Sequence, residues 1–223
     1  METTTLNIAK HLIAVCRKVE AKGFITATDG NISARLPNGN ILATPTSVNK
    51  GFVEIDDLVE LDAKGKQLSG KQRPSSEIDM HLFIYRHRHD VTAVVHCHPP
   101  YSTGFAVANI ALDRFVFPEV IVGFGKIPLA QYATPSTKEV GESLAPFVKE
   151  YDAVLLANHG VVTYGSDLWD AYFKMEKVEH VAQMIFIAEK MGGARELTEE
   201  QLEKLSAAAV KSYGKDISGK LKR

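Results

Sequence analysis

The chain has 223 residues, 45% of them hydrophobic and 24% charged, a balance typical of a globular protein with a sizeable core. Its net charge of −1 excludes the strongly basic surface that binds nucleic acids. No apolar run reaches the ~18 residues that a membrane span needs, and the N-terminus shows no signal-peptide pattern. We therefore expect a cytoplasmic protein without nucleic-acid or membrane partners, in which Cys16 and Cys97 are reduced core residues.

The first part of the chain is predicted to form a helix followed by short strands. Apolar residues recur at helical spacing from Leu6 to Val19, and Gly23 follows as a helix C-cap. Residues 32–35 and 41–43 are predicted strands joined by an Asn38-Gly39 hairpin turn. A third strand is expected at residues 58–62.

Another helix is predicted after a polar turn that ends in Ser75 and Ser76. Serine is a preferred N-cap residue, so Ser76 is the predicted N-cap. Glu77 would then be the first residue of a helix whose apolar stripe includes Ile78 and Leu82. Glu77 has two interpretations at this stage. It either interacts favourably with the helix dipole or serves as a functional acid.

Three histidines lie at the ends of two predicted buried strands. Residues 93–97 form an apolar, β-branched run that ends at Pro99, and His96 and His98 share one face because they are two residues apart. Residues 153–157 form a similar run that ends at His159. Neutral imidazole is a common zinc ligand, and three histidines with an open position are typical of a catalytic metal site.

The second half is predicted to alternate between helices and strands. Helices are expected at residues 100–109 and 137–150, with two short strands between residues 120 and 129. A long helix is capped by Asp167 and ends at Gly192-Gly193, and a capping box at Thr198 begins a last helix. Residues 214–223 are predicted to be a flexible tail. This alternation, without a linker, predicts a single α/β domain over residues 1–223.

Three short polar turns offer the groups that bind anions, above all phosphate. They are Gly30-Asn31, Thr46-Ser47 and Ser75-Ser76, and they supply hydroxyls, an amide and backbone N–H groups. Each turn by itself is more often only a turn. Lys50 would add a positive charge, although an exposed lysine is the simpler expectation.

Six short motifs follow one another along the chain. They are Gly30-Asn31-Ile32-Ser33, Thr44-Pro45-Thr46, Pro74-Ser75-Ser76-Glu77, His96-Cys97-His98, Tyr132-Ala133-Thr134 and Asn158-His159-Gly160. In this order they resemble the class II aldolase family typified by L-fuculose-1-phosphate aldolase and related to ribulose-phosphate 4-epimerases. The resemblance spans about residues 9–188. It implies a three-layer α/β/α fold with a mainly antiparallel sheet, a zinc ion or another divalent metal, and a homotetramer.

The resemblance also implies roles for individual residues. Metal ligation falls to His96, His98 and His159, and acid/base catalysis to Glu77. The implied reaction cleaves a ketose 1-phosphate, such as L-fuculose 1-phosphate, to dihydroxyacetone phosphate and an aldehyde. The implied phosphate pocket consists of Gly30, Asn31, Thr46, Ser47, Ser75 and Ser76.

The chain departs from the family pattern at two places. Ser47 stands where fuculose-phosphate aldolases usually have glycine, and Phe117 aligns near a tyrosine that a neighbouring subunit contributes in those enzymes. The proton donor on the aldehyde side is therefore open. Tyr213, near the C-terminus, is a candidate for contacts at that end.

Other activities on the same scaffold stay open. The 4-epimerases typically carry aspartate at the position of Glu77, which favours an aldolase. Dehydratases and decarboxylases of sugar phosphates or related acids also use this scaffold, and the variant turn around Lys50 keeps them in consideration. A noncatalytic interaction domain, as in adducin, is expected to have lost the histidines and the acid, all of which are present here.

Overall fold

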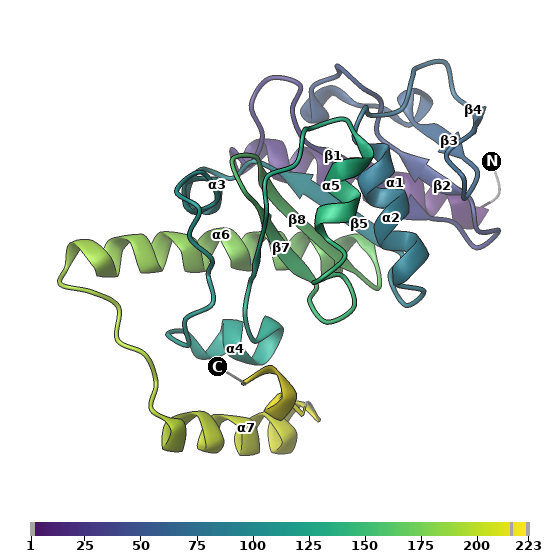
Figure 1. The fold of residues 1–223 in the computed structure, drawn as a ribbon. Helices are drawn as coiled ribbons and strands as arrows, with labels where there is room; N and C mark the ends of the chain where they lie inside the picture. The colour runs from purple at the N-terminus through teal and green to yellow at the C-terminus, as the bar shows by residue number, and fades with distance from the viewer. Residues whose placement is uncertain (1–2, 215, 222–223) are drawn as a thin grey trace.

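The computed structural model describes residues 3–214 and 216–221, and within them eight strands form one sheet (Figure 1). The strand order is β4-β3-β2-β1-β5-β8-β7-β6. Neighbouring strands are antiparallel except β6 and β7, which confirms the predicted mainly antiparallel sheet. The strands are β1 Asn31–Arg35, β2 Ile41–Ala43, β3 Val59–Leu61, β4 Gln67–Ser69, β5 Ala93–Cys97, β6 Leu129–Ala130, β7 Ala153–Leu156 and β8 Gly160–Gly165.

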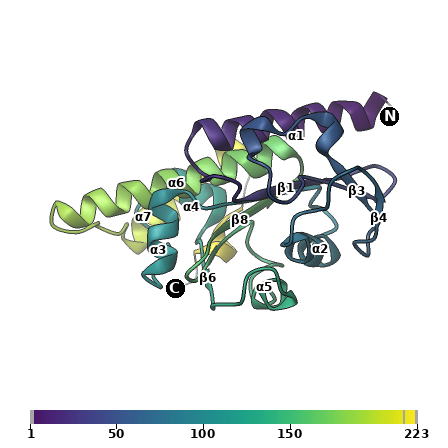
Figure 2. The same cartoon turned by 90° about the horizontal axis from the view of Figure 1, so that it is seen from above.

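Helices cover both faces of this sheet, as the predicted three-layer α/β/α fold requires. Helices α1 and α6 lie over one face, and α2 and α5 lie over the other (Figure 2). The helices are α1 Thr3–Ala21, α2 Ile78–His87, α3 Pro100–Val107, α4 Pro118–Phe124, α5 Lys138–Ser143, α6 Leu168–Lys190 and α7 Glu199–Tyr213. None of the described helices is long and apolar enough to cross a membrane.

The central strand β5 carries His96, His98 follows its last residue, and both faces of the strand are buried. It pairs with β1 on one side and β8 on the other, and all five of its residues are buried. Ala93 and Val95 join the core under α1 and α6, whereas Val94 joins the core under α2. By the two-residue period of a strand, His96 shares the face of Val94 and so points toward the side of α2.

The structure corrects the prediction of two strands between residues 120 and 129. The first of these is the helix α4, and only Leu129–Ala130 form a strand. Pro118 occupies the first helical turn, where its fixed φ favours a helix start, and Val120, Ile121 and Phe124 are buried. The β-branched composition of this run was therefore misleading. The helix predicted for residues 137–150 is also shorter, and strand β8 was not predicted.

The C-terminal helix α7 lies beside α4 and away from the sheet (Figure 1). A separate small core of Phe115, Ile121, Leu202, Ala209 and Ile217 joins this region. The flexible tail predicted for residues 214–223 includes residues 215, 222 and 223, which lie outside the described residues. Within that segment Ile217 is buried, and Ser218–Lys220 form a 3-10 turn.

Candidate active site

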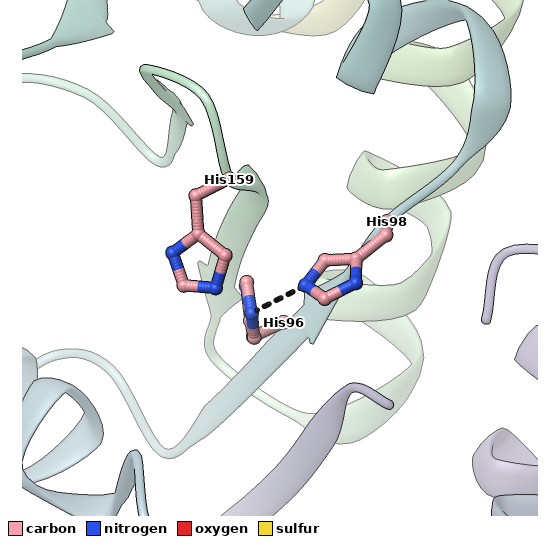
Figure 3. Close-up of side chains that lie close together, drawn as sticks. All are labelled: His96, His98 and His159. Atoms are coloured by element: carbon pink, nitrogen blue, oxygen red, sulfur yellow. Dashed lines mark hydrogen bonds between the residues drawn. The ribbon is translucent and has the colours of Figure 1, made fainter. Parts of the chain in front are cut away.

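Three histidine side chains converge where β5 ends and β8 begins (Figure 3). His96 is on β5, His98 follows it directly, and His159 lies in the turn between β7 and β8. One ring nitrogen of each histidine lies within 4.8 Å of the other two. The structure thus brings the three predicted metal ligands together.

The partners of the ring nitrogens show that this cluster fits a metal ion. His96 donates Nδ1–H to the Val161 carbonyl at 2.9 Å, so in the neutral ring the lone pair lies on Nε2. His98 Nδ1 lies 3.6 Å from a carboxylate oxygen of Asp29. The Nε2 atoms of His96 and His98 are only 3.1 Å apart, and their two lone pairs repel each other unless a proton or a metal cation lies between them. Three such nitrogens match the ligand set of a divalent metal with an open position.

Gly160 makes room for this cluster. A Cβ atom at this position would lie 2.5 Å from Cδ2 of His98 and 2.7 Å from the Cys97 carbonyl oxygen, distances that real Cβ atoms do not show. Asn158, two residues earlier, has φ of 56°, a left-handed conformation that asparagine tolerates better than most residues. The order Asn-His-Gly therefore has a steric reason in the turn between β7 and β8.

Glu77 directs its carboxylate into the histidine cluster. Its Oε2 lies 3.2 Å from Nε2 of His96, and its Oε1 lies 3.1 Å from Nε2 of His159. Asn31 donates Nδ2–H to Oε2 at 2.9 Å. Oε1 is buried with no hydrogen bond of good geometry, so it is a polar atom available to a ligand.

The start of α2 differs from the prediction and explains this placement. Glu77, not Ser76, occupies the N-cap position, and α2 begins at Ile78. The Glu77 side chain makes no capping hydrogen bond, and its backbone N–H donates to Oγ of Ser75 at 3.2 Å. Ser76 as N-cap was therefore wrong. The carboxylate turns toward the histidines instead of the helix end.

The charges in the cluster decide its resting protonation state. Burial raises the pKa of the Glu77 carboxyl, but the charge of His96 and the close Nε2 atoms of His96 and His159 outweigh burial and lower this pKa below its usual range. The pKa of His98 falls to about 3, first because of burial and then because of repulsion from His96 and His159. The resting site thus combines an ionised carboxylate with a neutral His98 ring.

The three polar turns meet in one cavity of about 350 Å³ beside the histidine cluster. A larger hollow of about 740 Å³ lies along α6, but none of the predicted site residues lines it. We assign the chemistry to the smaller cavity because its polar groups converge there. The predicted residues that line it are Gly30, Asn31, Thr46, Ser47, Ser75, Ser76, Glu77, His98 and His159.

Two of these turns depend on left-handed backbone. Gly30 has φ of 70°, and a Cβ atom there would lie 2.9 Å from the His96 carbonyl oxygen. Ser47 has φ of 57°, the conformation for which glycine is the preferred residue. The glycine that the family resemblance leads one to expect at this position would adopt this conformation without strain, whereas Ser47 adopts it with a side chain.

The chain is similar in sequence to a known protein family. The sequence profile of the Class II Aldolase and Adducin N-terminal domain matches residues 10–186. The chain belongs to the class II aldolase and adducin family. It is 39% identical over 171 residues to the 3-oxo-tetronate 4-phosphate decarboxylase of Escherichia coli K12, covering 74% of this chain and 80% of that one. It is 34% identical over 178 residues to the L-fuculose phosphate aldolase of Methanocaldococcus jannaschii, covering 80% and 95%.

Solved structures of family members have the same fold. YgbL of Escherichia coli, described as a putative aldolase/epimerase/decarboxylase, superposes with a TM-score of 0.83 at 32% identity and covers 89% of this chain and 97% of that one. An L-fuculose 1-phosphate aldolase superposes with a TM-score of 0.83 at 29% identity, covering 91% and 95%. These likenesses confirm the predicted class II aldolase fold and leave the individual activity to be argued from the site.

Two residues expected at the aldehyde end of this family's site lie elsewhere in the described chain. Phe117 is the N-cap of α4, and its ring packs 5.9 Å from the ring of His180. Tyr213 ends α7, is 70% exposed and lines a different hollow together with Glu119. Within this chain, neither residue lines the cavity beside the histidine cluster.

Lys50 differs from its expected exposure. Only 1% of it is exposed, and its Nζ donates to the carbonyl oxygens of Thr28 at 2.6 Å and Val48 at 2.8 Å. Burial lowers the pKa of this ammonium group. Lys50 thus ties together the two loops that carry Gly30 and Ser47, and it lines the same cavity.

Further residues of the site were missed by the sequence reasoning. Asp29 lies near His98, and Ser136 donates its hydroxyl to Oγ of Ser76 at 2.8 Å. Asp29 directly precedes the predicted Gly30 turn, so its position next to that turn was a sequence signal that could have identified it as a site residue. Ser136 follows the Tyr132-Ala133-Thr134 motif, whose first residue is largely exposed and does not line the cavity.

Proposed function

We propose that this chain is a zinc-dependent lyase that cleaves a ketose 1-phosphate, such as L-fuculose 1-phosphate, to dihydroxyacetone phosphate and an aldehyde. The observation that carries the proposal is the Glu77 carboxylate, which faces the histidine cluster inside the cavity of the three anion-binding turns. His96, His98 and His159 would hold the metal. When bound, zinc acts as a Lewis acid that stabilises the negative charge developing on substrate oxygens.

The residues of the three turns hold the end of the substrate that does not react. Backbone N–H groups and the hydroxyls of Thr46, Ser75 and Ser76 are suited to a phosphate, and Lys50 adds positive charge beneath the cavity. Once the phosphate is fixed, the reacting carbon of the substrate faces Glu77. Proton transfer then occurs between two groups already held in position, which lowers the entropic part of its barrier.

Glu77 transfers the proton at carbon. Its lowered pKa means that the resting group is a carboxylate, the form that removes a C–H proton of dihydroxyacetone phosphate in the synthetic direction. In the cleavage direction the hydroxyl that becomes the aldehyde carbonyl loses one proton, so the carboxylate takes up one proton before it acts as an acid. The protonated Glu77 carboxyl then delivers this proton to the negatively charged enediolate left by departure of the aldehyde. Asn31 holds the carboxylate in place for this step by donating Nδ2–H to Oε2 at 2.9 Å.

Decarboxylation of a phosphorylated 3-oxo acid is a second candidate, favoured by the 39% identity to a 3-oxo-tetronate 4-phosphate decarboxylase. Loss of CO2 next to a carbonyl group leaves negative charge on the adjacent carbon and carbonyl oxygen, as aldol cleavage does. For 3-oxo-tetronate 4-phosphate the protonated product is again dihydroxyacetone phosphate. The two activities would therefore use the same three histidines, the same three polar turns and Glu77, and they differ only in the group that leaves.

The test measures the leaving group. Zinc-loaded protein is incubated separately with L-fuculose 1-phosphate and 3-oxo-tetronate 4-phosphate, and dihydroxyacetone phosphate, aldehyde and CO2 are each quantified. We expect equimolar aldehyde and dihydroxyacetone phosphate from the ketose phosphate. CO2 from the keto acid, without aldehyde from the sugar, would establish the decarboxylase. Absence of dihydroxyacetone phosphate from both substrates and from a wider panel of ketose 1-phosphates would refute the proposal.

A further inference from the structure

Polar side chains of α2 and β1 interlock directly behind the carboxylate of Glu77. Glu77, His81 and Tyr85 follow one another at intervals of four residues and therefore lie on one side of the helix. Asn31 and Ser33 are two residues apart on β1 and share one face of the sheet. These five residues, which we call the polar ladder, alternate between helix and strand.

The polar ladder is continuous from the active site into the core. Asn31 Oδ1 lies 2.6 Å from Nε2 of His81, and Nδ1 of His81 lies 2.7 Å from Oγ of Ser33. Oγ of Ser33 lies 2.9 Å from the hydroxyl of Tyr85. The four residues behind Glu77 are each at most 5% exposed, so water does not substitute for a missing partner.

One arrangement of protons satisfies the whole polar ladder. Burial and the nearby charge of His96 lower the pKa of His81 to about 3, so the ring is neutral and has a single N–H. If Nε2 carries the hydrogen, His81 donates it to Asn31 Oδ1 and accepts a hydrogen bond from the Ser33 hydroxyl at Nδ1. Ser33 in turn accepts a hydrogen bond from the Tyr85 hydroxyl. If Nδ1 carries it, Nε2 must accept from the Asn31 amide.

The second arrangement places two acceptors against each other at the active site. The Asn31 amide would have to turn over, and its carbonyl oxygen would then face the Glu77 carboxylate at a contact of 2.9 Å. An ionised carboxylate accepts hydrogen bonds and donates none. Two buried oxygens without a hydrogen between them repel, so this arrangement is disfavoured.

We propose that the polar ladder positions Glu77: the carboxylate selects the Asn31 orientation that presents N–H to it, and His81 then holds that orientation by donating Nε2–H to Asn31 Oδ1. This rests on the proposed function of Glu77 and adds His81, Ser33 and Tyr85 as positioning residues that touch neither substrate nor metal. Asn31 thereby holds the catalytic carboxylate, in addition to lining the phosphate cavity as the family resemblance implies. The second hydrogen on its Nδ2 stays available for the phosphate.

The proton positions are directly observable, whatever reaction the protein catalyses. Neutron diffraction from deuterated crystals of the zinc-loaded protein should show deuterium on Nε2 of His81 and not on Nδ1. It should also show the deuterated side-chain nitrogen of Asn31, and not its carbonyl oxygen, directed at Glu77. Deuterium on Nδ1 of His81, or the reverse orientation of the amide, would overturn the proposal.

A kinetic comparison tests the consequence for catalysis. Ser33→Ala leaves Nδ1 of His81 without its hydrogen-bond partner, which weakens the hold of His81 on Asn31, and should lower kcat by roughly 10- to 100-fold with KM and zinc content near wild type. Thr163→Val is the matched control. It removes another fully buried strand hydroxyl, which donates to the Ala171 carbonyl at 2.8 Å outside the polar ladder, and kcat should stay within about twofold.

The two experiments separate the failure of this inference from the failure of the proposed function. Equal kcat values for Ser33→Ala and Thr163→Val would overturn the positioning role. If the wild type turned over none of the tested phosphates, the proposed function would fail, and the neutron map would still decide whether the polar ladder orients Asn31.

Discussion

Glu77 lies between two imidazoles and an amide, and every partner of its carboxylate is a hydrogen-bond donor or a metal ligand. A group that only stabilised the helix dipole would not need such surroundings, because an exposed charge near the helix end gives the same effect. The chemistry of this residue is therefore testable separately from its contribution to stability.

Replacement of Glu77 by Gln should lower kcat by about 10²- to 10⁴-fold with zinc still bound, because an amide cannot transfer the proton. The variant should also lose the exchange of a C–H proton of dihydroxyacetone phosphate with solvent deuterium. Glu60→Gln is a suitable control, since Glu60 also accepts a hydrogen bond from an asparagine, Asn40, but lies on β3 outside the cavity. Wild-type exchange in folded, zinc-loaded Glu77→Gln would move the acid/base role to another group.

His81 should make the stability of the protein depend on pH. Its pKa is lowered by burial from 6.5 to about 3, so between these values the unfolded chain binds a proton on this ring that the folded chain does not. This contribution to stability is complete above pH 6.5 and is lost as the pH falls toward 3, by about 1.4 kcal/mol per pH unit within that window.

The measurement is urea unfolding at pH 7.0 and pH 5.5 at fixed metal and protein concentrations. The free energy of unfolding of His81→Gln should fall by about 1 kcal/mol less than that of the wild type over this interval. The other titrating groups are shared by both proteins and cancel in the comparison. Identical pH dependence would mean that the pKa of His81 is the same in the folded and the unfolded chain.

At the scale of elements, the turn between β7 and β8 and the end of β5 have to pack closely to bring the histidines together. Gly160→Ala should weaken zinc binding by roughly 10-fold or more, because the new Cβ atom would overlap the His98 ring and the Cys97 carbonyl. Gly104→Ala on α3 meets no atom within 4 Å and should bind zinc normally. Competition with a chelator measures both affinities. Equal affinities would show that the turn adjusts without cost to the site.

The two loops joined by Lys50 provide a second prediction at this scale. Lys50→Met keeps the length of the side chain but leaves the carbonyls of Thr28 and Val48 without their donor, at a cost of about 1–3 kcal/mol of unfolding free energy. Because these loops carry part of the phosphate cavity, KM for a phosphorylated substrate should rise more than kcat falls. Lys64→Met on the exposed loop before β4 should change neither quantity. An unchanged KM in Lys50→Met would restrict this lysine to a purely structural role.

At the scale of the whole molecule, several large apolar side chains on and next to α3 and α6 are exposed. Ile110 and Phe186 line a mostly apolar hollow of about 420 Å³, and Val107 and Phe173 are also about half exposed. Exposed apolar groups gathered in this way indicate a surface that another protein covers. We predict the homotetramer that the family resemblance implies.

Sedimentation equilibrium of the zinc-loaded protein should therefore give a mass of about four times the 24.5 kDa of one chain. The mass should not change on dilution through the micromolar range, because obligate assemblies bury large apolar interfaces. A mass of a single chain would contradict this prediction. The aldehyde end of the site would then have to be built entirely within one chain.

The sequence determined those features that local patterns encode. Apolar, β-branched runs located the strand that carries His96 and the strand that precedes His159, and capping residues at Asp167 and Thr198 correctly located the starts of α6 and α7. The ordered motifs indicated the family, and the residues of the three polar turns were all named in advance. The prediction that the whole chain is one domain stays a prediction.

Only the tertiary structure decided which of these groups meet and in what state. Lys50 is buried because two loops close over it, and Glu77 turns away from its helix because histidines from β5 and the β7–β8 turn draw it in. The polar ladder joins residues 46 to 52 positions apart in the chain. Local sequence patterns record the backbone period and the caps of one element. The hydrogen-bond partner, burial and protonation of a side chain depend on another element packed against it, and a single sequence contains no local signal for that pairing.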